Sequence, residues 1–246
     1  MIKVILHGAA GRMGKEVAAK IEADPVLSLA ARVDQTGADG CLKNLADYTG
    51  DADVIVDFSH HSATGALTAY AVSRGIPLLI ATTGQTEEEK EMIARASEKV
   101  AVFHSANMSL GVALLCELAK KAAAGMPDAD IEIVETHHNR KLDVPSGTAL
   151  MIAEAMRKVR EKARFVIGRA GGKREKEEIG IASVRRGNIV GIHEVLISTD
   201  NETLTLKHEA HSRALFADGA VVAAKFLAGK GAGLYTMNDL VKENEA

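Results

Sequence analysis

Short apolar runs alternate with amphipathic stretches along the first part of this chain of 246 residues. The apolar runs predict five strands, over residues 1–7, 28–33, 53–58, 77–81 and 100–104. Helical periodicity follows the third, fourth and fifth of them, over about residues 61–74, 86–99 and 109–124. Continuous apolar strands separated by helices are typical of a parallel sheet that is buried on both faces. The pattern therefore predicts an α/β fold with a Rossmann-like, doubly wound parallel sheet.

The pattern changes after about residue 127. Residues 129–135 alternate polar and apolar side chains, as a strand with one solvated face does. A helix is predicted after Pro145, with Ser146 or Thr148 as its N-cap. The remaining elements are predicted as strands over 180–185, 188–198 and 202–209 and a helix over 212–227 that packs back on the first sheet. This second part predicts an antiparallel or mixed sheet with one covering helix, residues 145–158.

A glycine-rich turn, Gly8-Ala9-Ala10-Gly11-Arg12-Met13-Gly14, follows the first predicted strand and precedes a helical pattern. In this setting glycines bind a dinucleotide, because its pyrophosphate can approach the backbone N–H groups at the helix N-terminus. Asp34 ends the second strand twenty residues after Gly14, where an acidic side chain accepts hydrogen bonds from the adenosine ribose. The predicted cofactor contacts here are Gly8, Ala10, Gly11, Arg12, Met13, Gly14 and Asp34.

Small polar turns follow the fourth and fifth predicted strands, and ligands of doubly wound sheets bind at the carboxyl ends of strands. The further predicted cofactor contacts are Ala81, Thr82, Thr83, Ser105, Ala106, Asn107 and Met108. Gln35 and Thr36 place no cation beside Asp34, so NADH is expected to be at least as good a cofactor as NADPH. Arg12 in the glycine turn predicts that NADPH is still tolerated.

Candidate catalytic and binding side chains are most concentrated in residues 135–149. These residues read Glu-Thr-His-His-Asn-Arg-Lys-Leu-Asp-Val-Pro-Ser-Gly-Thr-Ala. Histidine titrates near neutral pH, Lys141 is a fixed positive charge, and the Pro-Ser-Gly-Thr turn opens the predicted helix. These are the groups needed to hold a small anionic substrate and to give it a proton.

Composition narrows the class of protein. The net charge of −3, without a basic run that includes aromatic residues, argues against nucleic-acid binding. No apolar run reaches membrane length and no signal peptide precedes the first strand, so no membrane partner is expected. The two cysteines have neither C-x-x-C nor metal-ligand spacing, so a cytoplasmic protein is expected.

The same motifs resemble the 4-hydroxy-tetrahydrodipicolinate reductase family, long called dihydrodipicolinate reductase. Besides the glycine turn, the resemblance rests on residues 82–84, 105–112, 135–149, 183–187, 191–193 and 211–213, and it covers essentially the whole chain. Residues 135–149 have the family form E-x-H-H-x-x-K-x-D-x-P-S-G-T-A. Met108, Leu110 and Ile192 depart from the residues that the family often has at those positions.

The resemblance implies hydride transfer from NADH or NADPH to a cyclic unsaturated dicarboxylate, with loss of water, in lysine and diaminopimelate biosynthesis. It implies that His137 donates the proton and that Lys141 neutralises developing negative charge. The residues that would hold the substrate carboxylates are His138, Ser146, Gly147 and Thr148. It also implies a homotetramer built through the sheet of the second domain.

The expected domains are a dinucleotide-binding domain, residues 1–107 and 216–246, and a substrate-binding and oligomerisation domain, residues 108–215. Two connections between them suit a hinge that closes over a substrate.

The sequence leaves two other functions open. One is a different NAD(P)-dependent reductase or dehydrogenase of an amino dicarboxylate, and the other is a non-catalytic NAD(H)-sensing protein. A metal site at the adjacent histidines is disfavoured, because no third ligand follows at a metal-like spacing. The other histidines are expected to be structural or peripheral: His7, His60, His61, His104, His193, His208 and His211.

Overall fold

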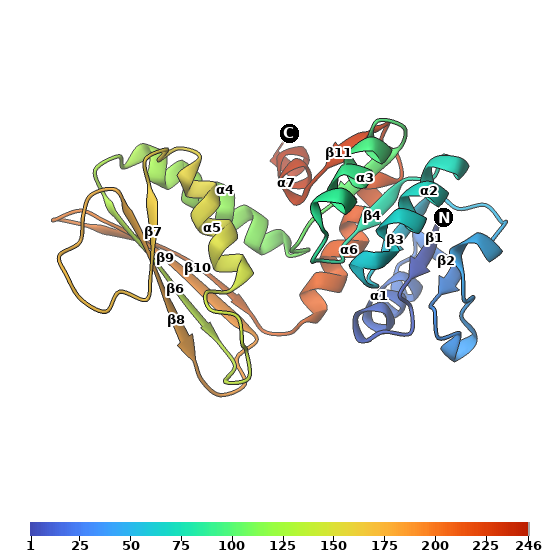
Figure 1. Cartoon of the computed structure of the whole chain (residues 1–246), viewed down its shortest axis with the longest axis horizontal. Coiled ribbons are helices and arrows are strands. Elements are labelled where there is room, and N and C mark those ends of the chain that lie inside the picture. Colours follow the sequence, from blue (N-terminus) through green and yellow to red (C-terminus); the bar gives the residue numbers. More distant parts are fainter. Residues whose placement is uncertain (246) are drawn as a thin grey trace. The chain divides into compact units, whose positions relative to one another are not determined.

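The computed structural model describes residues 1–245 and divides them into two compact units (Figure 1). The first unit consists of Met1–Ser109 together with the chain from Ala214 onward, and the second is Leu110–Arg213. Within residues 1–245, no helix is both long and apolar enough to cross a membrane.

The first unit is built on a parallel sheet with the strand order β11-β5-β4-β3-β1-β2. Its strands are β1 (Ile2–His7), β2 (Leu27–Val33), β3 (Val54–Asp57), β4 (Leu78–Ile80), β5 (Ala101–His104) and β11 (Gly233–Tyr235). The order reverses between β1 and β3, so the point where ligands bind in such sheets lies at the carboxyl ends of these two strands. The predicted doubly wound parallel sheet is confirmed.

Helices cover both faces of this sheet (Figure 1). They are α1 (Arg12–Ala23), α2 (Thr64–Arg74), α3 (Glu87–Ser97), α6 (Ala214–Leu227) and α7 (Met237–Glu245), with short 3₁₀ turns at Ala38–Gly40, Leu45–Asp47 and His61–Ala63. Helices α1 and α6 pack against each other, and α6 also packs on β3, β4 and β5, as predicted for the last helix. Helices α2 and α3 pack together and contact β4, β5 and β11.

The buried strands have apolar side chains on both faces, since successive residues point to opposite sides of the sheet. Register places Ile5 beside Ile55 in one layer and Val4 beside Val54 in the other. All four side chains are fully buried. This two-sided core explains why these strands have continuous apolar sequences.

The second unit has a five-stranded sheet with the order β10-β9-β6-β8-β7. Its elements are α4 (Leu110–Gly125), β6 (Asp130–His137), α5 (Gly147–Arg157), β7 (Arg164–Ile167), β8 (Glu178–Arg185), β9 (Gly191–Ser198) and β10 (Thr203–Ala210). Strand β6 is antiparallel to β9 and parallel to β8, so the predicted mixed sheet is confirmed. The prediction of one covering helix is wrong, because α4 and α5 both pack into the core beside this sheet.

The register of this sheet separates an apolar core from a polar row. Ile181, Ile133, Val195 and Leu206 are partners across β8, β6, β9 and β10, and they belong to the core. Two residues further along β6, the next row on the same face consists of Ser183, Glu135, His193 and His208. The apolar core therefore gives way to polar groups at the end of the sheet where α5 begins.

Candidate active site

The glycine turn after β1 is shaped by close backbone contacts. A Cβ atom on Gly8, which has φ +78°, would lie 2.6 Å from the Phe58 carbonyl oxygen, and one on Gly14 would lie 2.1 Å from the Gly8 carbonyl oxygen. Helix α1 begins at Arg12 and its N-cap residue, Gly11, has no side chain to cap it, so the first N–H groups lack intrahelical acceptors. These residues fit the pyrophosphate of a dinucleotide.

Asp34 lies directly after β2, and its carboxylate faces the glycine turn. It accepts hydrogen bonds from the Ala10 backbone N–H at 3.2 Å and from the Thr36 hydroxyl at 2.6 Å. The Thr36 hydroxyl and backbone hydrogen bonds outweigh partial burial and lower the pKa of Asp34. The side chain is therefore charged at neutral pH and lies where an adenosine ribose acceptor was predicted.

A second carboxylate, Asp57, joins three strand ends at the same edge of the sheet. It is 1% exposed and lies 2.8 Å from His7 Nδ1, and it accepts hydrogen bonds from the Ser59 and Thr82 hydroxyls, both at 2.6 Å. The Thr82 hydroxyl, assigned from the sequence to the cofactor, is thus bonded to Asp57. Asp57 was not predicted as a site residue, because its partners His7 and Thr82 lie 50 and 25 residues away in the chain.

The segment after β5 forms a compact turn. The Ser105 hydroxyl donates to the Asn107 carbonyl at 2.7 Å, and the Asn107 side-chain oxygen accepts from the Ser109 backbone N–H at 2.8 Å. Met108 is buried, and a Cβ on Gly219 of α6 would lie 1.7 Å from its carbonyl oxygen. Ala106 and Thr83 are exposed, while Ala81 is half-buried at the end of β4.

The second unit presents a buried carboxylate and imidazole at the end of β6. Glu135 and His137 lie two residues apart on this strand, so their side chains share a face, and Glu135 Oε2 lies 2.5 Å from His137 Nδ1. Arg185 of β8 binds both Glu135 oxygens, each at 2.8 Å. The Ser146 backbone N–H donates to Glu135 Oε1 at 3.1 Å. Glu135 is fully buried, so its charge is balanced by these contacts.

These contacts set the protonation of the pair. Burial would raise the pKa of Glu135, but its hydrogen bonds, led by Arg185, lower it to about 2. Burial lowers the pKa of His137 below its ordinary value, and the Glu135 carboxylate only partly offsets this. Lys141 and Arg185 lower the pKa of His137 further. Glu135 is therefore an anion at neutral pH beside a largely neutral imidazole.

The N-terminus of α5 lies next to this pair. The Ser146 hydroxyl caps the helix by accepting from the Ala149 backbone N–H at 3.2 Å, and it also lies 3.1 Å from His193 Nε2. The hydroxyl of Ser146, a predicted substrate contact, is thus buried and bonded within the protein. Gly147 is exposed and Thr148 half-buried, so the first turn of α5 remains accessible to an anion.

Lys141 and His138 occupy the turn between β6 and α5. Lys141 Nζ lies 2.9 Å from the Asp143 carboxylate, so Lys141 is already ion-paired. The His138 backbone N–H donates to the Ile189 carbonyl, and its Nδ1 has no hydrogen-bond partner in the described part of the chain. Burial, followed by the nearby arginine charges, lowers the pKa of His138.

Sequence reasoning missed three groups of this site. Glu135 and Arg185 were assigned no role, and His193 was expected to be structural or peripheral. The ring centroids of His193 and His137 are 5.2 Å apart. A signal was present, since Glu135 ends the predicted strand 129–135 and His137 follows two residues later, and Arg185 and His193 lie in motifs that carried the family resemblance. Only the sheet register shows that they converge.

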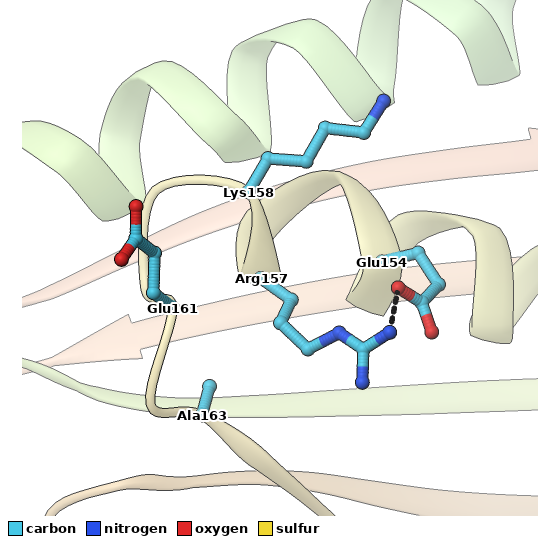
Figure 2. A pocket seen from close by; sticks show the side chains of 5 residues that line it. All are labelled: Glu154, Arg157, Lys158, Glu161 and Ala163. Atoms are coloured by element: carbon cyan, nitrogen blue, oxygen red, sulfur yellow. Dashed lines mark ion pairs between the residues drawn. The ribbon is translucent and has the colours of Figure 1, made fainter.

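A separate pocket of about 350 Å³ lies at the C-terminal end of α5 (Figure 2). It is lined by Glu154, Arg157, Lys158, Glu161 and Ala163, and Arg157 pairs with Glu154 at 2.7 Å. None of the predicted site residues lines it, and it lies at the other end of α5 from Ser146. The described residues also contain no group of three or more His, Cys, Asp or Glu placed to bind a metal ion.

Solved structures of dehydrogenases share this fold. A myo-inositol dehydrogenase from Corynebacterium glutamicum superposes with a TM-score of 0.59 at 18% identity, covering 95% of this chain and 90% of its own. At that identity the likeness concerns the fold alone, so the chain shares the fold of this dehydrogenase.

The family is shown by sequence. The models described as dihydrodipicolinate reductase, N-terminus, and dihydrodipicolinate reductase, C-terminus, match residues 2–108 and 111–241. The chain therefore belongs to the dihydrodipicolinate reductase family, as the motifs predicted. A protein from Caldanaerobacter subterraneus subsp. tengcongensis named 4-hydroxy-tetrahydrodipicolinate reductase is 47% identical and covers 99% of both chains. A dipicolinate-bound dihydrodipicolinate reductase from Paenisporosarcina sp. TG-14 superposes with a TM-score of 0.82 at 25% identity, covering 96% of this chain and 97% of its own.

The protonation of His193 predicts a pH dependence of stability. Burial and the charge of His137 lower the pKa of His193 from 6.5 to about 4. Between these values the unfolded chain takes up a proton that the native state excludes, so stability falls as the pH drops from 6.5 to 4. His193 contributes about 3 kcal/mol to this fall in the free energy of unfolding, at about 1.4 kcal/mol per pKa unit.

The measurement is urea unfolding at several pH values between 4 and 7. The variant His193→Gln should show a shallower fall in unfolding free energy than the wild type, whereas the matched variant of an exposed histidine, His60→Gln, should keep the wild-type slope. An unchanged slope in His193→Gln would mean that this imidazole is not buried in its neutral form.

Proposed function

We propose that this protein reduces 4-hydroxy-tetrahydrodipicolinate to tetrahydrodipicolinate with a reduced nicotinamide, with loss of water, in lysine and diaminopimelate biosynthesis. Family membership along nearly the whole chain supports the reaction. The observation that carries the site assignment is the Glu135–His137 pair beside the accessible N-terminus of α5. The proposed location is the cytoplasm, a reducing compartment in which Cys41 and Cys116 would stay free.

The first turn of α5 suits one carboxylate of a dicarboxylate substrate. We assign to it the backbone N–H groups of Gly147 and Thr148 and the Thr148 hydroxyl, because a helix N-terminus carries partial positive charge. Lys141 would exchange its partner Asp143 for the substrate, and His138 would bind the second carboxylate. The related dihydrodipicolinate reductase that is bound to dipicolinate supports a ligand with two carboxylates.

His137 would supply the proton. Reduced nicotinamide, when bound, supplies a hydride to a ring carbon, and the reduced ring then needs a proton. The imidazolium form of His137 can donate that proton, while Lys141 neutralises developing negative charge. A substrate dianion would favour the imidazolium, because it brings negative charge next to a ring whose pKa is low in the free protein.

The glycine turn and Asp34 would bind the dinucleotide. The Asp34 carboxylate is positioned to accept hydrogen bonds from a ribose, and a 2′-phosphate would meet a like charge there. We therefore propose that both NADH and NADPH serve, with NADH at least as good. Arg12 is exposed at the start of α1 and supplies a cation for NADPH.

Self-association through the second unit is part of the proposal. The face of the sheet opposite α4 and α5 has apolar residues on three neighbouring strands, including Val134, Val184 and Leu196. Val184 is 39% exposed. The same face also carries charged residues, including Glu132 and Glu194, so the interface that we propose between copies is mixed in character, and a homotetramer is the assembly that we propose.

The most direct activity test uses substrate made in situ by the enzyme that forms it, with NADH oxidation as readout. Turnover of this substrate, and little or none with other amino dicarboxylates, is the expected result. NADH binding without oxidation would instead indicate a cofactor-sensing protein, and preference for another dicarboxylate would indicate a different reductase.

Two variants test the catalytic assignment. His137→Gln should lower kcat by roughly 10²- to 10⁴-fold, which is the usual effect of removing a positioned general acid. Lys141→Ala should lower both kcat and substrate affinity, with unchanged NADH binding measured by fluorescence titration. Near-normal turnover in both variants would show that the site lies elsewhere.

A charge variant tests cofactor choice. Asp34→Ala removes the like charge that would face a 2′-phosphate, so the ratio of kcat/KM for NADPH to that for NADH should rise. The wild-type protein should use NADH at least as well as NADPH. A wild-type kcat/KM for NADPH more than about tenfold above that for NADH would contradict the role given to Asp34.

Inhibition tests the pocket with two carboxylates. Pyridine-2,6-dicarboxylate should compete with the substrate and not with NADH, and pyridine monocarboxylates should inhibit much more weakly because they leave donors unpaired. Thr148→Val removes one hydroxyl and should weaken dicarboxylate binding by about 1–3 kcal/mol in calorimetry. Equal inhibition by mono- and dicarboxylates would contradict this pocket.

A further inference from the structure

We infer that Glu135, held in place by Arg185, is a positioning residue that fixes the His137 ring so that Nε2 is the nitrogen that delivers the proton. This inference deepens the proposed function and rests on it, since it takes His137 as the proton donor.

The contacts of Glu135 determine which nitrogen of His137 carries hydrogen. An ionised carboxylate only accepts hydrogen bonds, so the 2.5 Å contact to Glu135 Oε2 requires hydrogen on His137 Nδ1. In the neutral ring, Nε2 then has the lone pair, and in the imidazolium it has the second hydrogen. The only proton that the ring can give up while it keeps its contact to Glu135 is the one on Nε2.

The carboxylate itself has little freedom to turn. Arg185 holds both of its oxygens through two parallel N–H groups, a geometry that fixes orientation as well as distance. The same guanidinium donates to the Asp143 carbonyl at 2.7 Å, in the turn that carries Lys141. Ser146, the N-cap of α5, donates its backbone N–H to the carboxylate. The imidazole is thus tied to β8 and to both ends of the segment that is proposed to bind substrate.

Gly191 keeps the other side of the imidazole free of a side chain. A Cβ on Gly191 would lie 3.0 Å from His137 Nε2, closer than ordinary van der Waals contact. Any side chain on this residue of β9 would therefore crowd the nitrogen that is inferred to act. The sequence thus places an acceptor against Nδ1 and a residue without a Cβ beside Nε2.

The charges around His137 explain why the carboxylate matters. Lys141 and Arg185 oppose protonation of the ring, and His193 packs edge-on against it. Lys141 is in turn paired with Asp143. Glu135 is the one acidic group that raises the pKa of His137 among its main influences. Without this carboxylate, the ring would lose its proton at a lower pH and could turn.

The proton balance of the reaction follows. One hydride and one proton enter the substrate, while its hydroxyl group and one hydrogen from its own ring leave together as water. The proton passes from His137 Nε2 to the reduced ring, and the imidazole is left neutral with its Nδ1 hydrogen still bonded to Glu135. A proton from solution then recharges Nε2.

The test compares Glu135→Gln with Glu117→Gln. Glu117 lies on α4 of the same unit, is half-buried and pairs with Lys120 at 3.5 Å, so it controls for the loss of an ion-paired glutamate that has no part in the proposed site. Glu135→Gln should lower kcat by roughly 10- to 100-fold with an unchanged KM for NADH, a loss no larger than that expected from removing the general acid itself. The basic limb of its kcat/KM profile should move to lower pH. Glu117→Gln should keep the wild-type rate and profile.

A double variant separates positioning from a merely structural role. In the background of His137→Gln, the change Glu135→Gln should cause no further loss of kcat, because a positioning residue acts through the residue it orients. Multiplicative losses in the double variant, or an unmoved basic limb in Glu135→Gln, would overturn the inference.

Arg185→Lys provides the same test if Glu135→Gln does not fold. Lysine keeps the charge but lacks the two-pronged geometry of the guanidinium, so kcat should fall, and this loss too should vanish in the His137→Gln background.

The assay of the wild-type protein tests the proposed function independently of how the variants compare with one another. If the wild type does not reduce the proposed substrate, an NMR titration of the His137 ring still decides the inference, since the ring should titrate at lower pH in Glu135→Gln than in the wild type. An equal or higher value would refute it.

Discussion

Burial of a single carboxylate, Glu135, determines how the site of the second unit is built. An ion without water must be surrounded by hydrogen-bond donors, and those donors come from separate parts of the chain. Arg185 arrives from β8, Ser146 from the start of α5, and His137 from the same strand. Each contact stabilises the Glu135 carboxylate and also positions a residue that takes part in the proposed reaction or supports one that does. The stability of this region and the geometry of the site therefore share one cause.

The first unit uses the same principle with Asp57. This carboxylate is almost fully buried at the carboxyl edge of the parallel sheet, where it joins the ends of β1, β3 and β4 through His7, Ser59 and Thr82. The glycine turn that follows His7 then packs directly on the backbone after β3. In both units a buried carboxylate fixes the end of a sheet, and the segments that follow are free to carry the binding groups.

Sequence patterns predicted the elements whose burial is regular. The apolar runs of β1 and β3–β5 and the helices α2 to α6 were found because both kinds of element repeat their side-chain environment along several residues. Strands β7 and β11 were missed because they are edge strands without a fully buried residue, so they lack a continuous apolar run. Helix α7 was also not predicted. The second covering helix, α4, was placed in the chain correctly, but periodicity does not tell which sheet a helix covers.

The candidate site was predicted only where its residues are close in sequence. His137, Lys141 and Gly147 fall in one motif, whereas Arg185 lies 50 residues from Glu135 and is brought to it by the pairing of β6 with β8. Register and side-chain geometry hold information that a linear motif lacks. This is why the orienting carboxylate and its arginine emerged from the structure and not from the pattern.

A crystal structure of the protein with NADH and pyridine-2,6-dicarboxylate tests the central claim most directly. The account predicts one ligand carboxylate on the N–H groups of Gly147 and Thr148, and the ligand ring within hydrogen-bonding reach of His137 Nε2, about 2.6–3.2 Å or through one water. Glu135 should remain bonded to Nδ1. A dicarboxylate bound away from α5, or a His137 ring with Nε2 turned toward Glu135, would contradict the account.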